Sequence, residues 1–167
     1  MIRAVVVALV AFVPMIGEAR RSRRHDRALL ALGAIEPPGD VYRVMQIAYP
    51  GCFVAIAGEA WLRATPVGPS FIAGICLFAL AKGLKYWAIA TLGPRWTFRV
   101  LVPPGQPLIA GGPYRLMRHP NYAGVAGEIV GAALIGAAPI AGVASLLVFG
   151  SLMLARIRVE ERALGGL

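Results

Sequence analysis

Four long apolar blocks dominate this chain of 167 residues, and they constrain its fold more than any other feature. They cover residues 4–17, 44–62, 67–92 and 123–155. A helix needs about 20 apolar residues to cross a hydrocarbon core roughly 30 Å thick, so the second and third blocks each predict one span. Only 15% of the residues are charged, against about 25% in a typical soluble domain. The pattern predicts an all-α integral membrane protein and excludes an ordinary soluble globule, a disordered tail and a coiled coil.

The first and fourth blocks do not match the length of one span. Residues 1–18 predict an uncleaved first span, tilted or in a locally thinned bilayer, because no small-residue cleavage site precedes Arg20-Arg21. The fourth block is too long for one helix, and Gly136-Ala137-Ala138-Pro139 predicts a break within it. We therefore expect about five transmembrane helices, the last two forming a helical hairpin, in a single domain over residues 1–167.

The net charge of +9 is compatible with nucleic-acid binding, but the positions of the arginines favour a signal for membrane topology. With five spans, thirteen arginines fall on one side of the membrane, and only Arg3 and Arg63 fall on the other. The positive-inside rule then places the N-terminus outside and the C-terminus in the cytoplasm. We expect contacts with anionic membrane lipid and no nucleic-acid partner. The thirteen are Arg20, Arg21, Arg23, Arg24, Arg27, Arg43, Arg95, Arg99, Arg115, Arg118, Arg156, Arg158 and Arg162.

Residues 94–122 form the segment least like a membrane helix. It contains Gly112-Pro113-Tyr114 and Arg118-His119-Pro120-Asn121-Tyr122. Because proline is favoured in the first turn of a helix, a helix is expected to begin at Pro120. The free N–H groups of that helix end, beside Arg118 and His119, suit a carboxylate or a phosphate.

Two further groups of charged residues are candidates for function. Glu128 lies deep in a predicted span, where burying an ionisable group is costly and usually indicates a functional site. A purely structural pairing with Lys82 or Lys85 also explains it. After the last span come Arg156 and Glu160-Glu161, which alone would be an ordinary charged helix end. Because both segments leave the same side of a hairpin, we expect residues 94–122 and 156–164 to form one site. Neither cysteine has a spacing typical of a metal site, and no metal is predicted.

The motif Gly112-Pro113-Tyr114…Arg118-His119-Pro120-Asn121-Tyr122, followed after two spans by Arg156-Ile157…Glu160-Glu161…Leu164, resembles the isoprenylcysteine carboxyl methyltransferase (ICMT) family. The resemblance extends to Gly33-Ala34-Ile35-Glu36, Glu59 and Leu92-Gly93…Trp96-Thr97, which are similar to short bacterial members. Some of those members O-methylate alkylpyrone hydroxyls. The family consists of integral-membrane enzymes that use S-adenosyl-L-methionine.

The resemblance implies a role for each candidate residue. Arg118 and His119 would hold the carboxylate of S-adenosyl-L-methionine. Glu160 or Glu161 would bind its amino group or its ribose hydroxyls. Tyr114 and Tyr122 would contact its adenine or its sulfonium. The acceptor would be lipophilic or lipidated, with an isoprenylcysteine carboxylate or an alkylpyrone hydroxyl, and would enter from the bilayer. The implied cofactor-binding set is Gly112, Pro113, Tyr114, Arg118, His119, Pro120, Tyr122, Glu160 and Glu161, and the implied catalytic set is Lys85, Arg156 and Glu128.

Two other classes of function remain open from the sequence. An NADPH-dependent membrane reductase of lipids or sterols shares the Arg-His-Pro-Asn-Tyr element, but there a Glu often follows the glycine, whereas Val125 follows Gly124 here. A non-enzymatic membrane adaptor would not need Glu128 and Lys85 at depth. A soluble-type methyltransferase of the Rossmann class is excluded, because the chain has no glycine-rich dinucleotide fingerprint.

Overall fold

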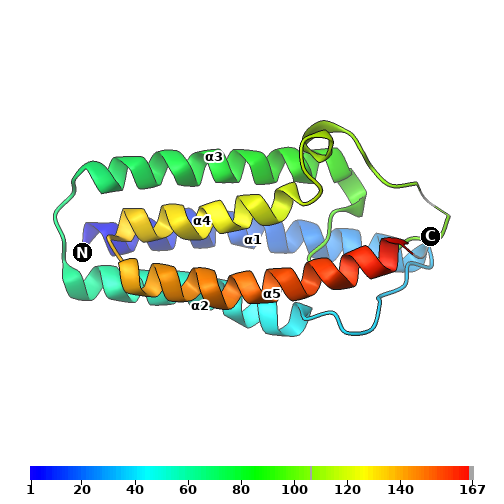
Figure 1. Cartoon of the computed structure of the whole chain (residues 1–167), viewed down its shortest axis with the longest axis horizontal. Helices are drawn as coiled ribbons and strands as arrows, with labels where there is room; N and C mark the ends of the chain where they lie inside the picture. The colour runs from blue at the N-terminus through cyan, green and yellow to red at the C-terminus, as the bar shows by residue number, and fades with distance from the viewer. Residues whose placement is uncertain (106, 166–167) are drawn as a thin grey trace.

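The computed structural model describes residues 1–105 and 107–165, and within them the chain is an all-helical bundle, as predicted. Figure 1 shows the helices side by side, with the two chain ends at opposite ends of the bundle. The long connections 32–41 and 93–119 lie at the end where the C-terminus lies (Figure 1). The described residues form α1 (Ile2–Ala31), α2 (Tyr42–Arg63), α3 (Pro69–Leu92), α4 (Pro120–Gly136) and α5 (Pro139–Gly165), with the short 3-10 helices η1 (Gly93–Arg95) and η2 (Gly112–Arg115).

The outer surface of the bundle is apolar, as in a protein surrounded by lipid. Three segments, Ile2–Ala31, Pro69–Arg95 and Pro139–Ala163, are long and apolar enough to cross a membrane. On α1 the exposed face carries Val5, Leu9, Val13 and Ile16, where a soluble bundle would present polar side chains. These features are those of an integral membrane protein.

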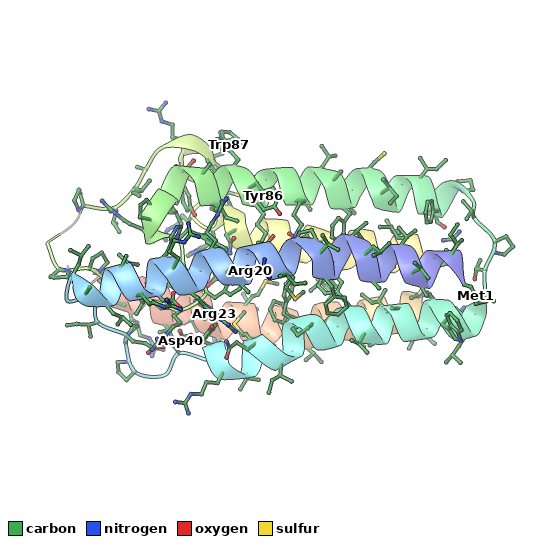
Figure 2. The ribbon with its side chains drawn as sticks, turned by 180° about the vertical axis from the view of Figure 1, so that it is seen from behind. Met1, Arg20, Arg23, Asp40, Tyr86 and Trp87 are labelled. Carbon is green, nitrogen blue, oxygen red and sulfur yellow. The ribbon has the colours of Figure 1, made fainter. Side chains whose placement is uncertain are left out.

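Helix α1 is longer than the predicted first span of residues 1–18, because it continues through the arginine run to Ala31. A helix of 30 residues is about 45 Å long, so its second half extends well past the apolar segment. In that half Ser22, Asp26 and Leu29 face the bundle, while the arginines of the run are exposed. Residues 18–32 contain no glycine or proline that would end the helix, and Gly33, with a φ of +81°, suits its end. Figure 2 shows Arg20, Arg23 and Asp40 in the half of the molecule away from Met1.

The chain breaks where the proline and small residues predicted it. Helix α4 ends at Gly136, Ala137 adopts a left-handed conformation with φ 50°, and α5 begins at Pro139. Glu59 of α2 accepts a hydrogen bond of 2.6 Å from the N–H of Ala141 and so satisfies the exposed start of α5. Glu59, one of the residues that carry the family resemblance, therefore caps the start of α5.

Buried Arg3 holds together the end of the bundle at which the N-terminus and the α4–α5 turn lie. Its guanidinium donates to the carbonyl oxygens of Ile135 at 2.8 Å and of Pro66 at 2.6 Å. These carbonyls belong to the last turn of α4 and to the connection between α2 and α3. A cation there satisfies backbone acceptors that a helix C-terminus leaves free.

Close contact between α3 and α4 depends on glycines. A Cβ atom on Gly131 of α4 would lie 2.8 Å from the backbone nitrogen of Phe78 on α3. A Cβ atom on Gly124 would lie 3.0 Å from the Cβ of Lys85. Small residues let membrane helices approach closely enough for backbone packing, and this approach brings α4 against the lysines of α3.

We predict that Gly131→Ala destabilises the bundle while Gly150→Ala does not. Alanine favours a helix by about 1 kcal/mol over glycine, and a Cβ on Gly150 meets no atom within 4 Å. At Gly131 the backbone of Phe78 must move, and overpacking of this kind costs about 1–3 kcal/mol. Thermal unfolding of the detergent-solubilised protein should show a melting temperature lower by roughly 3–10 °C for Gly131→Ala only. Equal melting temperatures for the two variants would contradict the prediction.

Candidate active site

The structure brings together the two motifs that the sequence analysis singled out. His119 immediately precedes α4, and its Nε2 lies 3.3 Å from Glu161 Oε1 while its Nδ1 lies 3.7 Å from Glu160 Oε2. Tyr122, in the first turn of α4, donates a hydrogen bond of 2.5 Å to Glu160 Oε1. Arg118 Nη1 lies 3.5 Å from Glu161 Oε1. The start of α4 and the end of α5 therefore form one cluster of cations, carboxylates and a phenol.

Arg156 extends this cluster into the protein. Its Nε lies 3.5 Å from Glu160 Oε1, and its Nη1 lies 3.8 Å from Asp40 Oδ1. Asp40 in turn accepts hydrogen bonds from the backbone N–H groups of Tyr42 at 3.1 Å and Val100 at 3.0 Å. One carboxylate thus connects both long connections to α5. Sequence reasoning missed Asp40, although an Asp after Pro37-Pro38-Gly39 and before a helix is a common turn and capping signal.

The two long connections are also joined directly. Arg99 donates to Glu36 through Nε at 3.2 Å and through Nη2. Ile35 and Val102 exchange two backbone hydrogen bonds of 3.0 Å. Hydrogen bonding from the Arg99 guanidinium lowers the pKa of the Glu36 carboxyl below its usual value. The Gly33-Ala34-Ile35-Glu36 motif therefore holds the connection 93–119 in place.

A cavity of about 760 Å³ lies between these connections and the helices. Its loop half holds most of the charged lining residues beside apolar residues of the connection 93–119, and its deep half, toward the middle of the bundle, is mainly apolar. Tyr114 lines the loop half, where burial, with a further contribution from the Glu160 carboxylate, raises the pKa of its phenol above the usual value. Loop-half residues include Tyr114, Arg118, His119, Tyr122, Arg156, Glu160 and Glu161, and deep-half residues include Met15, Met45, Tyr49, Lys85, Val125 and Phe149.

The remaining residues predicted to bind the cofactor do not line the cavity: Gly112, Pro113 and Pro120. Gly112 has a φ of +52°, and a Cβ atom there would lie 2.4 Å from Thr91 Oγ1 on α3. Pro113 and Pro120 are buried. These three residues set the backbone path of the connection and the start of α4. The side chain of Leu164, in the predicted segment 156–164, lies outside the described part of the structure.

Glu128 belongs to a buried group of four charges that we call the charge cluster: Glu18 of α1, Lys82 and Lys85 of α3, and Glu128 of α4. Lys85 Nζ lies 2.6 Å from Glu18 Oε2 and 3.5 Å from Glu128 Oε1. Lys82 Nζ lies 3.0 Å from an oxygen of each glutamate. Two cations therefore balance two anions. The pairing that the sequence left open for Glu128 is present, and the sequence analysis missed Glu18 as its second carboxylate.

Tyr49 of α2 connects the charge cluster to the cavity. Its hydroxyl donates to Glu128 Oε2, and Lys85 Nζ lies 3.5 Å from the hydroxyl oxygen. Its ring packs against Phe53 and Phe149, with ring centroids 5.0 and 5.1 Å apart. Tyr49 and Lys85 line the cavity, whereas Glu128 lies behind them. Sequence analysis gave no signal for Tyr49, because a single tyrosine in a membrane helix is common near the interface.

Fold and site together define a helical membrane protein with a partly open small-molecule cavity at the arginine-rich end of its bundle. The cavity volume falls in the range of about 300–1,000 Å³ that such sites usually have. Its two halves can receive a charged, water-soluble molecule on one side and an apolar one on the other.

Comparison with known proteins identifies the family. The sequence model of the isoprenylcysteine carboxyl methyltransferase (ICMT) family matches residues 73–165, which is more than half of the chain. The chain belongs to this family of membrane methyltransferases, and the resemblance seen in the sequence is confirmed. The match spans α3 to α5, including both motifs of the loop half.

Two bacterial relatives match over most of their length. The chain is 29% identical over 144 residues to the Bacillus subtilis (strain 168) protein titled "Uncharacterized protein YpbQ", covering 86% of this chain and 85% of the relative. It is 25% identical over 147 residues to a Haemophilus influenzae protein titled "Uncharacterized protein", covering 87% and 86%. No solved structure gives a significant match.

We predict that the Glu36–Arg99 pair stabilises the protein fully at pH values above the pKa of a free Glu, which is near 4.3. This contribution should be lost as the pH falls through the pKa of Glu36 in the folded protein, which is lower. The pair is about one-third exposed, so Glu36→Gln should lower the melting temperature at pH 7 by no more than roughly 2–4 °C. The difference from the unaltered protein should disappear well below pH 4.

Arg99→Gln provides the control for this pair. If the two groups stabilise each other, the double variant should be no less stable than either single variant. Additive losses of melting temperature, or a loss that persists unchanged in acid, would contradict the pairing.

Proposed function

We propose that the protein is an S-adenosyl-L-methionine-dependent methyltransferase that transfers a methyl group to an oxygen atom of a lipophilic acceptor. The observation that carries this proposal is the meeting of Arg118-His119 with Glu160-Glu161 in the loop half of a cavity whose deep half is mainly apolar. Membership of a methyltransferase family supports the same reaction class.

The loop half of the cavity fits the chemistry of the methyl donor. Arg118 and His119 offer donors for its carboxylate, because charged donors suit an anion. Glu160 or Glu161 offers acceptors for its ammonium group or its ribose hydroxyls. Tyr114 and Tyr122 would contact the adenine or the sulfonium, the latter as a cation–π contact. When bound, the donor supplies an electrophilic methyl group next to the deep half.

The backbone around these side chains supports the same assignment. Gly112, Pro113 and Pro120 fix the connection and the helix start from which the donors project. Arg118 is 83% exposed in its pairing with Glu161, so it can turn to a ligand at little cost. A salt bridge this exposed contributes about 0–1 kcal/mol, which a bound carboxylate readily replaces.

The deep half of the cavity suits the acceptor. Met15 and Phe149 provide apolar surface, and Lys85 provides a cation near the acceptor oxygen. Arg156 of the loop half is the second cation, and Glu128 would act from behind the wall of the cavity. An isoprenylcysteine-like carboxylate and an alkylpyrone-like hydroxyl are both acceptors of this kind. Exclusion of water and correct positioning would then provide most of the catalysis.

We further propose a single-domain protein with five transmembrane helices in a bacterial inner membrane, α4 and α5 forming a hairpin. The N-terminus would lie outside, and the site and the C-terminus would face the cytoplasm, where S-adenosyl-L-methionine is made. The thirteen arginines at the loop end support this orientation and contacts with anionic lipid. Nucleic acid has no place in this arrangement.

The orientation predicts the outcome of reporter fusions in a bacterium. Alkaline phosphatase, which is active only outside the cytoplasm, should be active when fused after Thr65 and inactive when fused after Gly105. A green fluorescent protein at the C-terminus should fluoresce. The inverse pattern would contradict the proposed orientation.

We predict that Arg118→Gln and His119→Ala weaken binding of S-adenosylhomocysteine by about tenfold or more, since loss of a charge-assisted hydrogen bond costs about 1.5–3 kcal/mol. Methyl transfer should fall while the protein still inserts into the membrane. Arg115→Gln is the matched control, because this exposed arginine lies in the same connection but does not line the cavity. Calorimetry of the detergent-solubilised variants measures the affinities.

The same calorimetry separates the proposal from the two other classes. Binding of S-adenosylhomocysteine and not of NADPH is expected. Binding of NADPH alone would indicate the reductase, and binding of neither would indicate the adaptor. Normal turnover by purified His119→Ala would contradict the role given to His119.

A further inference from the structure

Most of the lysine and arginine side chains that line the cavity are paired with acids, but two are not. Arg23 of α1 and Arg95 of η1 form no ion pair with any residue that the structure describes. Arg95 donates one hydrogen bond of 2.6 Å to the carbonyl oxygen of Pro107, and a guanidinium has five N–H donors. Both side chains therefore keep donors for an anion. The paired residues are Lys85, Arg99, Arg118 and Arg156.

The two unpaired arginines come from elements that lie against each other. Helix η1 contacts α1, and His25 Nδ1 lies 2.7 Å from the carbonyl oxygen of Trp96. Trp96 directly follows Arg95 in the chain, and His25 is two residues after Arg23. The contact between His25 and Trp96 therefore holds Arg95 close to the part of α1 that carries Arg23.

Arg23 lies at the edge between the lipid-facing surface of α1 and the cavity. It follows Ile16 by seven residues, about two helical turns, and so continues the exposed row of Leu9 and Ile16. It also continues the row of Met15 and Ala19, which line the cavity. A group bound by Arg23 can therefore lie at the edge of the cavity while the rest of its molecule stays in the bilayer.

The lengths of α1 and α3 give the depth of this edge in the membrane. Arg3 Nη1 lies 3.3 Å from Ser70 Oγ, so these two residues are at the same level. Arg20 follows Arg3 by seventeen residues, and Trp87 follows Ser70 by the same number, which is about 25 Å of helix. Figure 2 shows Arg20 and Trp87 at the same level of the bundle. An exposed tryptophan and an arginine at this distance mark the boundary between the hydrocarbon and the headgroups.

Arg23 falls within the headgroup layer by this measure. It is three residues past Arg20, about 4.5 Å along the helix, and the headgroup layer is about 5–7 Å thick on each side of the membrane. The anions at this depth are lipid phosphates, and the planar guanidinium matches a phosphate well. The methyl donor needs neither Arg23 nor Arg95, because its one carboxylate is assigned to Arg118 and His119.

We propose that Arg23 and Arg95 bind the phosphate of one anionic phospholipid at the edge of the cavity, with its acyl chains on the exposed face of α1. This site is more specific than the general contact of the arginines with anionic lipid, because it is saturable and takes one lipid. It does not depend on the proposed methyl transfer.

The test is calorimetry of the full-length protein in an uncharged detergent at low salt, with three probes. Dihexanoylphosphatidylglycerol carries a phosphate and two chains, glycerol phosphate carries the phosphate alone, and dihexanoylglycerol carries the chains alone. The variants are Arg23→Gln, Arg95→Gln and the double variant. Arg24→Gln on α1 and Arg115→Gln in the connection 93–119 are the matched controls, because both arginines are exposed and neither lines the cavity.

The unaltered protein should bind dihexanoylphosphatidylglycerol saturably, with one lipid per chain, and about tenfold or more tightly than either partial probe. Arg23→Gln and Arg95→Gln should each weaken this binding by about fivefold, since an arginine next to anionic lipid contributes about 1 kcal/mol. The double variant should lose roughly 25-fold, and each control should lose less than about twofold.

Three results would overturn the inference. Equal losses in the variants and the controls would indicate diffuse attraction, and equal binding of glycerol phosphate or of dihexanoylglycerol would indicate a free-anion site or an apolar surface. A parallel loss of S-adenosylhomocysteine affinity in Arg23→Gln and Arg95→Gln would assign these arginines to the donor site, whereas we expect that affinity to be unchanged. Failure of the unaltered protein to bind S-adenosylhomocysteine would overturn the proposed function and leave the lipid site standing.

Discussion

The pairing of two lysines with two glutamates inside the bundle is the constraint on which the rest of the structure depends. Charges in a hydrocarbon environment persist only when they are paired, and here Glu18, Lys82, Lys85 and Glu128 come from three helices. A slip of one turn along α1 would move Glu18 by about 5.4 Å, which exceeds the reach of its contacts with the lysines. The charge cluster therefore fixes the register of α1, α3 and α4.

Close packing makes this pairing possible and also positions the site. Gly124 and Gly131 bring α4 against α3, so Lys85 reaches both glutamates while its ammonium stays at the floor of the cavity. The same placement of α4 puts Pro120, and with it His119 and Tyr122, opposite the end of α5. The position of α4 therefore determines both the pairing of Glu128 in the charge cluster and the contact between His119 and Glu161.

The sequence predicted local features of this arrangement well, because local chemistry determines them. Pro120 and Pro139 begin helices where expected, and the two charged motifs meet at one end of the bundle. The partners Glu18 and Tyr49 were missed because they depend on how each helix is rotated about its axis. In a membrane protein, lipid-facing and core-facing residues are both apolar, so the amphipathic signal that reveals this rotation in soluble helices is weak. Asp40 was missed because its partner Arg156 is more than a hundred residues away.

The position of the cavity suits the two ligands that we propose for it, because they dissolve in different phases. Its loop half is built from exposed and half-buried ion pairs, which are weak where water competes and can be exchanged for a charged ligand. Its deep half ends at the charge cluster, in which two lysines are paired with two glutamates. The water-soluble methyl donor and the bilayer-dissolved acceptor that we propose would meet at the boundary between these two environments. Arg156, held by Glu160 and Asp40, ties α5 to the connections that line the loop half, and so keeps the loop half in place beside the deep half.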